Sequence, residues 1–254
     1  MKLAVVQMLV EPGQKSSNLT RAEQRIAEAA GRGAEIVLLP EAMTLGWTHP
    51  SALTLADPIP GGESCARLKQ AATDHGVFVC SGLVEQCEST IFNAAVLIDP
   101  AGRVILHHRK IHELDFAQSL YARGDRLSVA PTPWGPVGLM ICADAFAPGQ
   151  ILSRSLGAMG AQLILSPCAW AVPADHDNVR EPYGALWREN YGPVARDYGL
   201  VVAGASNVGP ISAGPWAGRK CIGNSLVIGR NGEDLACGPY GENAESTLIV
   251  DLTF

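Results

Sequence analysis

The 254-residue sequence lacks the features that mark membrane-spanning and nucleic-acid-binding proteins. No stretch approaches the roughly 20 apolar residues that a transmembrane helix needs. Acidic side chains outnumber basic ones, 25 against 19, which gives a net charge of −6, and no basic cluster exceeds "HHRK" at 107–110. Because nucleic acids and anionic membranes attract basic surfaces, neither is expected as a partner.

The sequence also has no repeat of fixed period, no low-complexity tract and no long linker. We therefore expect a single domain over residues 1–254. The opening "MKLAVVQMLVEPGQ" holds only a short apolar run that breaks at Glu11-Pro12. This pattern predicts a strand and a turn rather than a signal peptide, and hence a cytoplasmic protein.

The cysteines form no CxxC pair, and their number is odd. They are Cys65, Cys80, Cys87, Cys142, Cys168, Cys221 and Cys237. Zinc ribbons and thioredoxin-like motifs are therefore poorly supported. In a reducing compartment, most of these thiols are expected to be small buried hydrophobic side chains.

What the sequence does contain is an alternation of buried-type strands and helical patterns. Hydrophobic residues make up 47% and charged residues 17%, as in ordinary globular proteins. Strands are predicted over 2–8, 34–41, 77–86, 136–142, 162–167, 200–207 and 246–252, with a hairpin over 91–110 and a strand-rich segment over 223–237. Helices are predicted over 18–33, 64–76, 149–161 and 184–199. This mixed βα and ββ order predicts a layered α/β domain.

Three polar residues follow predicted strands directly. Glu41 comes after "IVLLP", Lys110 ends "RVILHHRK", and Cys142 ends "VGLMI". In open α/β sheets, ligands bind at the carboxyl ends of strands, where the loops converge. If these strands are neighbours, a carboxylate, an ammonium and a thiol share one pocket.

These three groups suit nucleophilic catalysis. A free thiol has a pKa of about 8.5, so only a few per cent is thiolate at neutral pH. Glu41 could accept the thiol proton of Cys142 as general base. Lys110 and the backbone N–H of Ala143 could stabilise the negative charge that develops when the thiol attacks an amide or nitrile carbon.

The ordered set "LLPEAMTLGW", "HHRKIHELDF" and "GLMICADAF" resembles the Glu–Lys–Cys triad of the nitrilase, or carbon–nitrogen hydrolase, superfamily. The resemblance extends to "KLAVVQM", "FNAAVLIDPAGRVILHHRK", the "GD" at 124–125, "LILSPCAW" and "GNSLVIGRNGEDLA", and so covers nearly the whole chain. It implies a four-layer αββα sandwich and a homo-oligomer. It also implies hydrolysis of a non-peptide C–N bond through a thioester, with no metal or organic cofactor.

The sequence departs from the family at two places. After Cys142 it has Ala143 and Asp144 and then "AFAPG", where many members carry an aromatic, the Asp, and an Arg-Phe-Pro-Glu run. Asp144 is expected to stabilise the turn. Many members also place a second glutamate seven residues before the Gly of "GD", and here that position is Ala117. Glu113 or Asp115 could substitute only if the loop were rearranged.

Residues of the pocket wall are predicted from their places in the motifs. Trp47 follows Glu41, and Trp170 follows a later strand, although both could equally be core tryptophans. The polar loop 174–184 is expected to shape the entrance, with Glu181 as a possible second acid on position alone. Cys168 is a weaker nucleophile candidate because its neighbours indicate a strand end.

The histidines at 107, 108 and 112 do not predict a metal site, because adjacent residues on a strand point to opposite faces. We expect them to be solvated or hydrogen-bonded.

The sequence thus predicts a cysteine-dependent amidase that acts on a small carboxamide or carbamoyl compound and releases ammonia or an amine. Three alternatives remain open: nitrile hydrolysis by the same residues, a non-catalytic ligand-binding protein that has kept the fold, and a redox-sensing thiol at Cys142.

Overall fold

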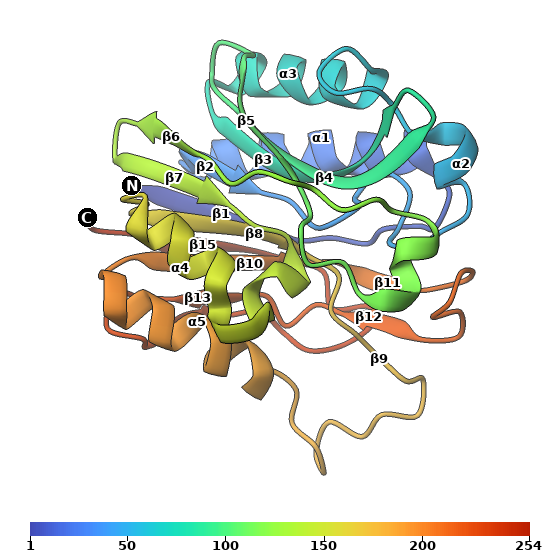
Figure 1. The fold of residues 1–254 in the computed structure, drawn as a ribbon. Coiled ribbons are helices and arrows are strands. Elements are labelled where there is room, and N and C mark those ends of the chain that lie inside the picture. The colour runs from blue at the N-terminus through green and yellow to red at the C-terminus, as the bar shows by residue number, and fades with distance from the viewer.

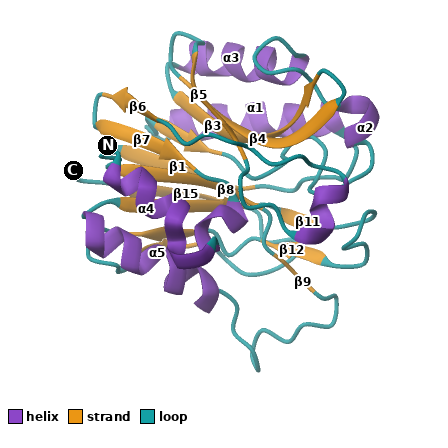
Figure 2. Cartoon of the chain, in the orientation of Figure 1, coloured by secondary structure: helices purple, strands orange, loops and turns teal.

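Two six-stranded sheets pack face to face in the computed structural model, which describes all residues from 1 to 254 (Figure 1). Helices cover the outer face of each sheet, and both termini lie at the same end of the sheets (Figures 1 and 2). No helix combines the length and the apolar composition of a membrane span.

The first sheet consists of β1 (Lys2–Gln7), β2 (Ile36–Leu38), β3 (Phe78–Cys87), β4 (Thr90–Ile98), β5 (Val104–Arg109) and β15 (Ser246–Asp251), in the order β15-β1-β2-β3-β4-β5. β1, β2 and β3 are parallel, while β4 is antiparallel to β3 and β5 is antiparallel to β4. β5 therefore runs in the same direction as β2, so their carboxyl ends reach the same edge of the sheet.

The second sheet consists of β6 (Val129–Thr132), β7 (Gly135–Leu139), β8 (Leu163–Cys168), β10 (Val201–Ser206), β13 (Leu226–Ile228) and β14 (Asp234–Cys237), in the order β14-β13-β10-β8-β7-β6. Its central strands β7, β8 and β10 are parallel. A small third sheet contains β9 (Ala171–Val172), β11 (Val208–Pro210) and β12 (Lys220–Ile222).

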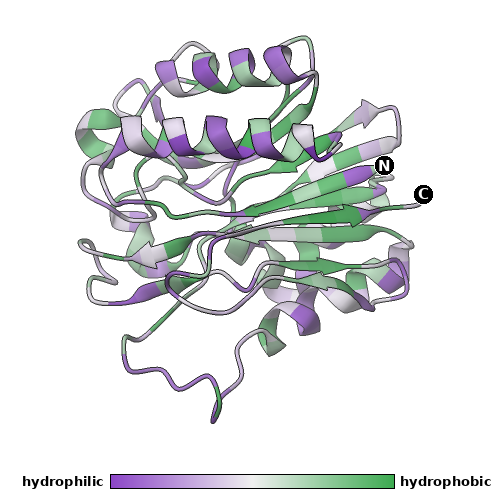
Figure 3. Cartoon of the chain, turned by 180° about the vertical axis from the view of Figure 1, so that it is seen from behind, coloured by the Kyte–Doolittle hydropathy of each residue, from purple (hydrophilic) through white to green (hydrophobic).

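Three hydrophobic cores separate four layers. Leu38 and Leu165 belong to the core between the two sheets. The second core joins the first sheet to α1 (Lys15–Gly31) and α3 (Glu63–His75), and the third joins the second sheet to α4 (Ile151–Ala158) and α5 (Ala185–Tyr198). The helices carry polar residues on their outer faces and the strands between them are apolar (Figure 3). The predicted αββα sandwich is confirmed.

The helices α3 and α5 end within one residue of the predicted positions, whereas α1 ends at Gly31 and α4 at Ala158, two and three residues earlier than predicted. Gly76 after α3 and Gly199 after α5 have φ of 63° and 60°, in the left-handed region where glycine is favoured at helix ends. One further short helix, α2 (Ala52–Leu55), lies in the segment before α3.

Two strand ends differ from the prediction. β2 stops at Leu38, shortly before Pro40, which has no N–H to donate to the sheet. β7 stops at Leu139, so Cys142 does not end a strand but begins a 3₁₀ helix, Cys142–Phe146. Cys142 itself has φ of 43°, which lies outside the extended region typical of strands.

Candidate active site

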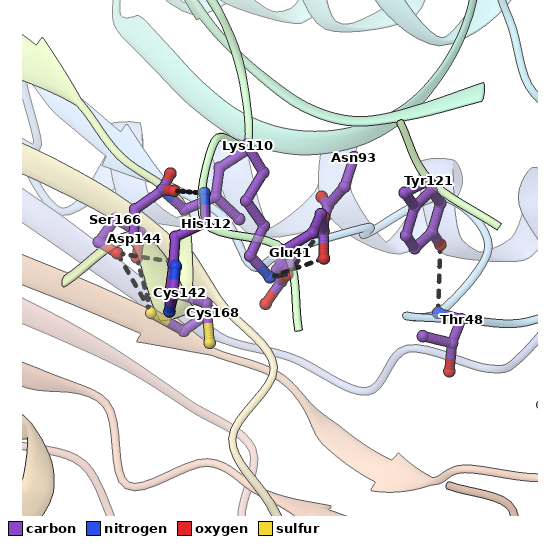
Figure 4. Close-up of polar contacts among 12 residues, drawn as sticks. Glu41, Thr48, Asn93, Lys110, His112, Tyr121, Cys142, Asp144, Ser166 and Cys168 are labelled. Atoms are coloured by element: carbon purple, nitrogen blue, oxygen red, sulfur yellow. Dashed lines mark hydrogen bonds and ion pairs between the residues drawn. The ribbon is translucent and has the colours of Figure 1, made fainter. Parts of the chain in front are cut away.

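The three residues predicted to share a pocket do line one cavity (Figure 4). Glu41 follows β2, and Lys110 follows β5, both at the same edge of the first sheet. Cys142 follows β7 of the second sheet, and the Glu41 N–H donates to the Cys168 carbonyl at the end of β8, 3.1 Å away. The edges of the two sheets therefore meet at this cavity.

Glu41 and Lys110 form a buried ion pair. Lys110 Nζ lies 2.7 Å from Glu41 Oε1, and Asn93 Nδ2 donates to the same oxygen at 2.7 Å. Both charged side chains are 1% exposed, and Glu41 Oε2 has no hydrogen-bond partner. Burial alone would lower the pKa of Lys110, but the charges of Glu41 and Glu113 outweigh it and raise that pKa above its ordinary value. Lys110 is thus an ammonium, and one oxygen of Glu41 is free.

A second buried carboxylate, Glu113, also contacts Lys110. Its Oε2 lies 3.7 Å from Lys110 Nζ, and its side chain is fully buried. Burial raises the pKa of Glu113 to about 7, although the charge of Lys110 pulls it downward. Ala117 is buried in the 3₁₀ helix Asp115–Ser119, and Asp115 is exposed. Of the two acids considered in place of the second glutamate, Glu113 and Asp115, Glu113 is the one that reaches the lysine.

Two glycines allow the backbone to approach these residues closely. A Cβ on Gly82 would lie 2.5 Å from Glu41 Cα. The N–H of Gly124 donates to the Lys110 carbonyl at 2.7 Å, and a Cβ there would overlap the Arg109 carbonyl. The Gly of the "GD" motif is therefore required to keep the lysine segment in place.

Cys142 lies on a strained turn. Its φ of 43° is in the left-handed region, which costs a non-glycine residue about 1 kcal/mol or more. Its N–H donates to Ser166 Oγ at 3.2 Å. Burial raises the pKa of the Cys142 thiol above its ordinary value, and the nearby Cys168 thiol and Glu41 carboxylate add to this effect. The thiol is therefore neutral and needs a base to become a nucleophile.

Asp144 joins the cysteine turn to the lysine loop (Figure 4). Its Oδ1 accepts from the N–H groups of Ile111 and His112 at 3.1 and 2.7 Å. Its Oδ2 accepts from the Ile141 N–H at 2.9 Å and contacts His108 Nε2 at 2.8 Å. Burial would raise the pKa of Asp144, but the hydrogen bonds from His108 and the backbone keep it below its ordinary value. The predicted stabilising role of Asp144 in the turn is confirmed, and it extends to the loop after Lys110.

The cavity has a volume of about 230 Å³. Ala143, Trp47 and Trp170, all predicted from the sequence, are among its lining residues. Sequence reasoning missed Leu114, Phe146, Ala169, Ala171, Tyr183, Leu186, Trp187 and Trp216. Tyr183 belongs to the loop that was expected to shape the entrance. For Trp187 and Trp216 only their aromatic character was available as a signal.

The remaining candidates lie elsewhere. Glu181 is exposed, and Cys168 is fully buried against Ser166, outside the lining of the cavity. Of the histidines, His107 contacts Glu85 at 2.9 Å and His108 contacts Asp144. Their separate partners confirm that they are hydrogen-bonded, and no group of three or more His, Cys, Asp and Glu side chains is placed to hold a metal ion.

Comparisons with known proteins show which proteins the chain resembles. The nitrilase of Pyrococcus abyssi (strain GE5 / Orsay) is 29% identical over 255 residues, which cover 99% of this chain and 90% of that protein. The omega-amidase of Xenopus tropicalis is 37% identical over 181 residues, which cover 66% of this chain and 63% of that protein. The match thus spans less than two thirds of the omega-amidase.

A solved structure has the same fold. It is a Cys-to-Ala mutant of the amidase from Nesterenkonia sp. AN1 in complex with butyramide, with a TM-score of 0.82 and 25% identity over 99% of this chain and 90% of that chain. The family model for carbon-nitrogen hydrolases matches residues 2–254. The family resemblance predicted from the motifs is confirmed: the chain belongs to the carbon-nitrogen hydrolase family and is an enzyme of that class.

Proposed function

We propose that the chain is an amidase in which Cys142 is the nucleophile, Glu41 the general base and Lys110 the electrostatic stabiliser. The observation that carries the proposal is the set of groups at the cavity: a neutral thiol, a carboxylate with one free oxygen, and an ammonium. The similar proteins also support an amidase activity, because one of them is an omega-amidase and another is an amidase with bound butyramide.

The first half of the reaction forms a thioester. Glu41 Oε2 accepts the thiol proton, and Cys142 Sγ attacks the carbonyl carbon of the amide. The carbonyl oxygen becomes an oxyanion, which Lys110 Nζ and the backbone N–H of Ala143 stabilise. The C–N bond then breaks, Glu41 returns its proton to the nitrogen, and ammonia leaves.

The second half hydrolyses the thioester. Water gives a proton to Glu41 and attacks the thioester carbon. The second tetrahedral intermediate collapses by breaking the C–S bond, the acid leaves, and the thiolate recovers its proton from Glu41. Lys110 stays an ammonium throughout, because two carboxylates hold its pKa above the ordinary value.

The direct test measures ammonia release from butyramide, isobutyramide, benzamide, a carbamoyl compound and butyronitrile. We expect turnover of amides by the native chain and none by Cys142→Ala. Cys80→Ala is the control, because Cys80 is a fully buried cysteine in the core between the sheets, away from the cavity. Normal turnover by Cys142→Ala would refute the mechanism, and turnover of butyronitrile alone would favour a nitrilase.

We also propose a cytoplasmic homo-oligomer with one domain over residues 1–254. The family resemblance supports the assembly, and the matched range of 2–254 supports the single domain. Light scattering of the purified chain measures the oligomeric state, and a monomeric mass would contradict this part of the proposal.

A further inference from the structure

The charged side chains that line the cavity lie next to each other. Fourteen residues line it, and Glu41 and Lys110 are the only charged ones. Both are 1% exposed and bind one another. Away from the reacting groups, the substrate therefore faces an almost entirely apolar surface.

Aromatic rings line the cavity in two groups, which form its walls. On the side of the cysteine turn, Trp170 stacks on Trp187 with ring centroids 4.6 Å apart, and Phe146 packs on Trp187 at 5.7 Å. On the side of Glu41, Trp47 packs edge-on against Trp216 at 4.9 Å. These ring contacts fix the walls in place, and fixed aromatic surfaces favour apolar groups.

The other polar groups at the cavity are neutral: Trp47 Nε1 and Trp170 Nε1 have no hydrogen-bond partner, and neither carries a charge. Trp187 Nε1 donates to the Tyr183 hydroxyl at 3.0 Å, and burial raises the pKa of Tyr183 above its ordinary value, so this side chain is a neutral phenol. Lys110 is shared by Glu41 and Glu113. Arg219 stacks on the Trp216 ring at 4.3 Å and is not among the residues that line the cavity. No cation is left to pair with a carboxylate on the substrate.

We propose, on the basis of the amidase function proposed above, that the substrate is a primary amide of a small, neutral, apolar acid. An amide that also carries an ionised carboxylate is rejected, because that charge would be buried between aromatic walls with no cation to compensate it. The volume of about 230 Å³ limits the acyl group to a few carbons or one ring, since it lies below the usual size of ligand pockets, about 300–1,000 Å³.

A matched pair of amides tests the proposal. In 4-methylpentanamide an isopropyl group replaces the carboxylate of succinamate, with the same chain length and a similar shape. We expect kcat/KM for 4-methylpentanamide to exceed that for succinamate at least 100-fold. Calorimetry with Cys142→Ala should detect binding of 4-methylpentanamide and none of succinamate.

The outcomes separate the two proposals. Comparable kcat/KM for both amides would overturn the specificity and leave the amidase function standing. No turnover of any neutral amide would overturn the amidase function, and the specificity with it.

A variant of the cavity wall tests whether the lack of a cation is the reason that succinamate is rejected. Leu186 lines the cavity from the start of α5 and is 47% exposed, so an arginine there can keep its charge in water. We expect Leu186→Arg to raise kcat/KM for succinamate relative to 4-methylpentanamide at least tenfold, while Leu186→Met keeps the native ratio. An unchanged ratio in Leu186→Arg would contradict the proposal.

Discussion

Glu41 and Lys110 come from the first sheet and Cys142 comes from the second, and the two sheets hold their residues by different means. On the first sheet, side chains hold one another: Asn93, Lys110 and Glu113 form a buried set around Glu41 by charge and hydrogen bonds. On the second sheet, side chains hold the backbone: the turn at Cys142, whose φ is in the left-handed region, is fixed by hydrogen bonds that backbone N–H groups donate to Ser166 and Asp144.

This difference predicts two kinds of failure. Removing a charge on the first sheet leaves a buried partner uncompensated, which affects folding as well as chemistry. Removing a hydrogen bond on the second sheet releases the turn and mainly affects the position of the thiol. Substitution of Asp144 should cause both kinds of failure, because this residue joins the cysteine turn to the loop after Lys110.

The largest effect is expected for Lys110→Met, which leaves Glu41 and Glu113 buried side by side without a cation. We expect loss of activity and a decrease of about 3–5 kcal/mol in the free energy of unfolding, measured with urea. Lys15→Met is the control, since Lys15 also binds two carboxylates, Asp57 at 2.6 Å and Glu63 at 3.4 Å, but with a side chain 15% exposed. Lys15→Met should lower the free energy of unfolding by about 1 kcal/mol or less. Equal costs would contradict the special role of the buried set.

Asp144→Asn breaks the connection between the sheets. It removes a carboxylate that accepts hydrogen bonds on both oxygens, and should lower the free energy of unfolding by about 2–3 kcal/mol, with a large fall in kcat. Because the folded pKa of Asp144 lies below the unfolded value of 3.8, its stabilisation is present above that pH and is lost as the pH falls further. The acid limb of the stability curve should therefore be flatter in the variant.

Asp99→Asn is the matched control for this prediction. Asp99 is also buried, also has a pKa below its ordinary value because Arg103 and backbone groups outweigh the effect of burial, and lies in a turn after β4. The control should lose stability but keep kcat/KM. Loss of activity in both variants would mean that Asp144 acts through stability alone.

Glu113→Gln tests how the second buried carboxylate of the first sheet affects the pH dependence of activity. As the pH rises through about 7, Glu113 loses its proton and adds a negative charge beside Lys110 and Glu41. This charge changes the electrostatic field at the reacting groups, so kcat/KM should show an inflection over the same range. The variant should lack this inflection. Asp115→Asn, which changes an exposed carboxylate on the same segment, should retain it. An inflection that persists in Glu113→Gln would assign it to another group.

The smallest effect is expected for Ser166→Ala. The variant leaves the Cys142 N–H without its acceptor at 3.2 Å, which should cost about 1 kcal/mol and lower kcat several-fold with little change in overall folding. Ser153→Ala is the control, because its buried hydroxyl donates to Gln150 within the α4 region, outside the cavity lining. A thousandfold loss in Ser166→Ala would show that this hydroxyl does more than hold the turn.

The layered fold and the meeting of the three residues could be predicted because both follow from local patterns. Apolar runs and terminal glycines mark the strands and helices, and the direction of the strands brings Glu41, Lys110 and Cys142 to the edges at which the two sheets meet. The predicted end of β7 was wrong by three residues. The turn at Cys142 depends on hydrogen bonds that the Cys142 N–H donates to Ser166 and the Ile141 N–H donates to Asp144, and the apolar pattern does not indicate them.

Counting along the chain did not single out Glu113. The count back from Gly124 ends at Ala117, and nothing in the sequence shows that a short 3₁₀ helix begins at Asp115, two residues after Glu113. The spacing of three residues between Lys110 and Glu113 was a usable signal. Trp216 lies in the segment between β11 and β12, with no periodic pattern to place it, so only the folded chain brings it to Trp47.

The unpartnered oxygen of Glu41 sets the order of events in the proposed reaction. Glu41 Oε1 is occupied by Lys110 and Asn93, so a single oxygen must serve both half-reactions. Ammonia must leave before water can be activated, and the two products therefore depart in sequence around a covalent intermediate. Any small amine that enters in place of water would receive the acyl group, so hydroxylamine added during turnover should divert the acid product into a hydroxamate.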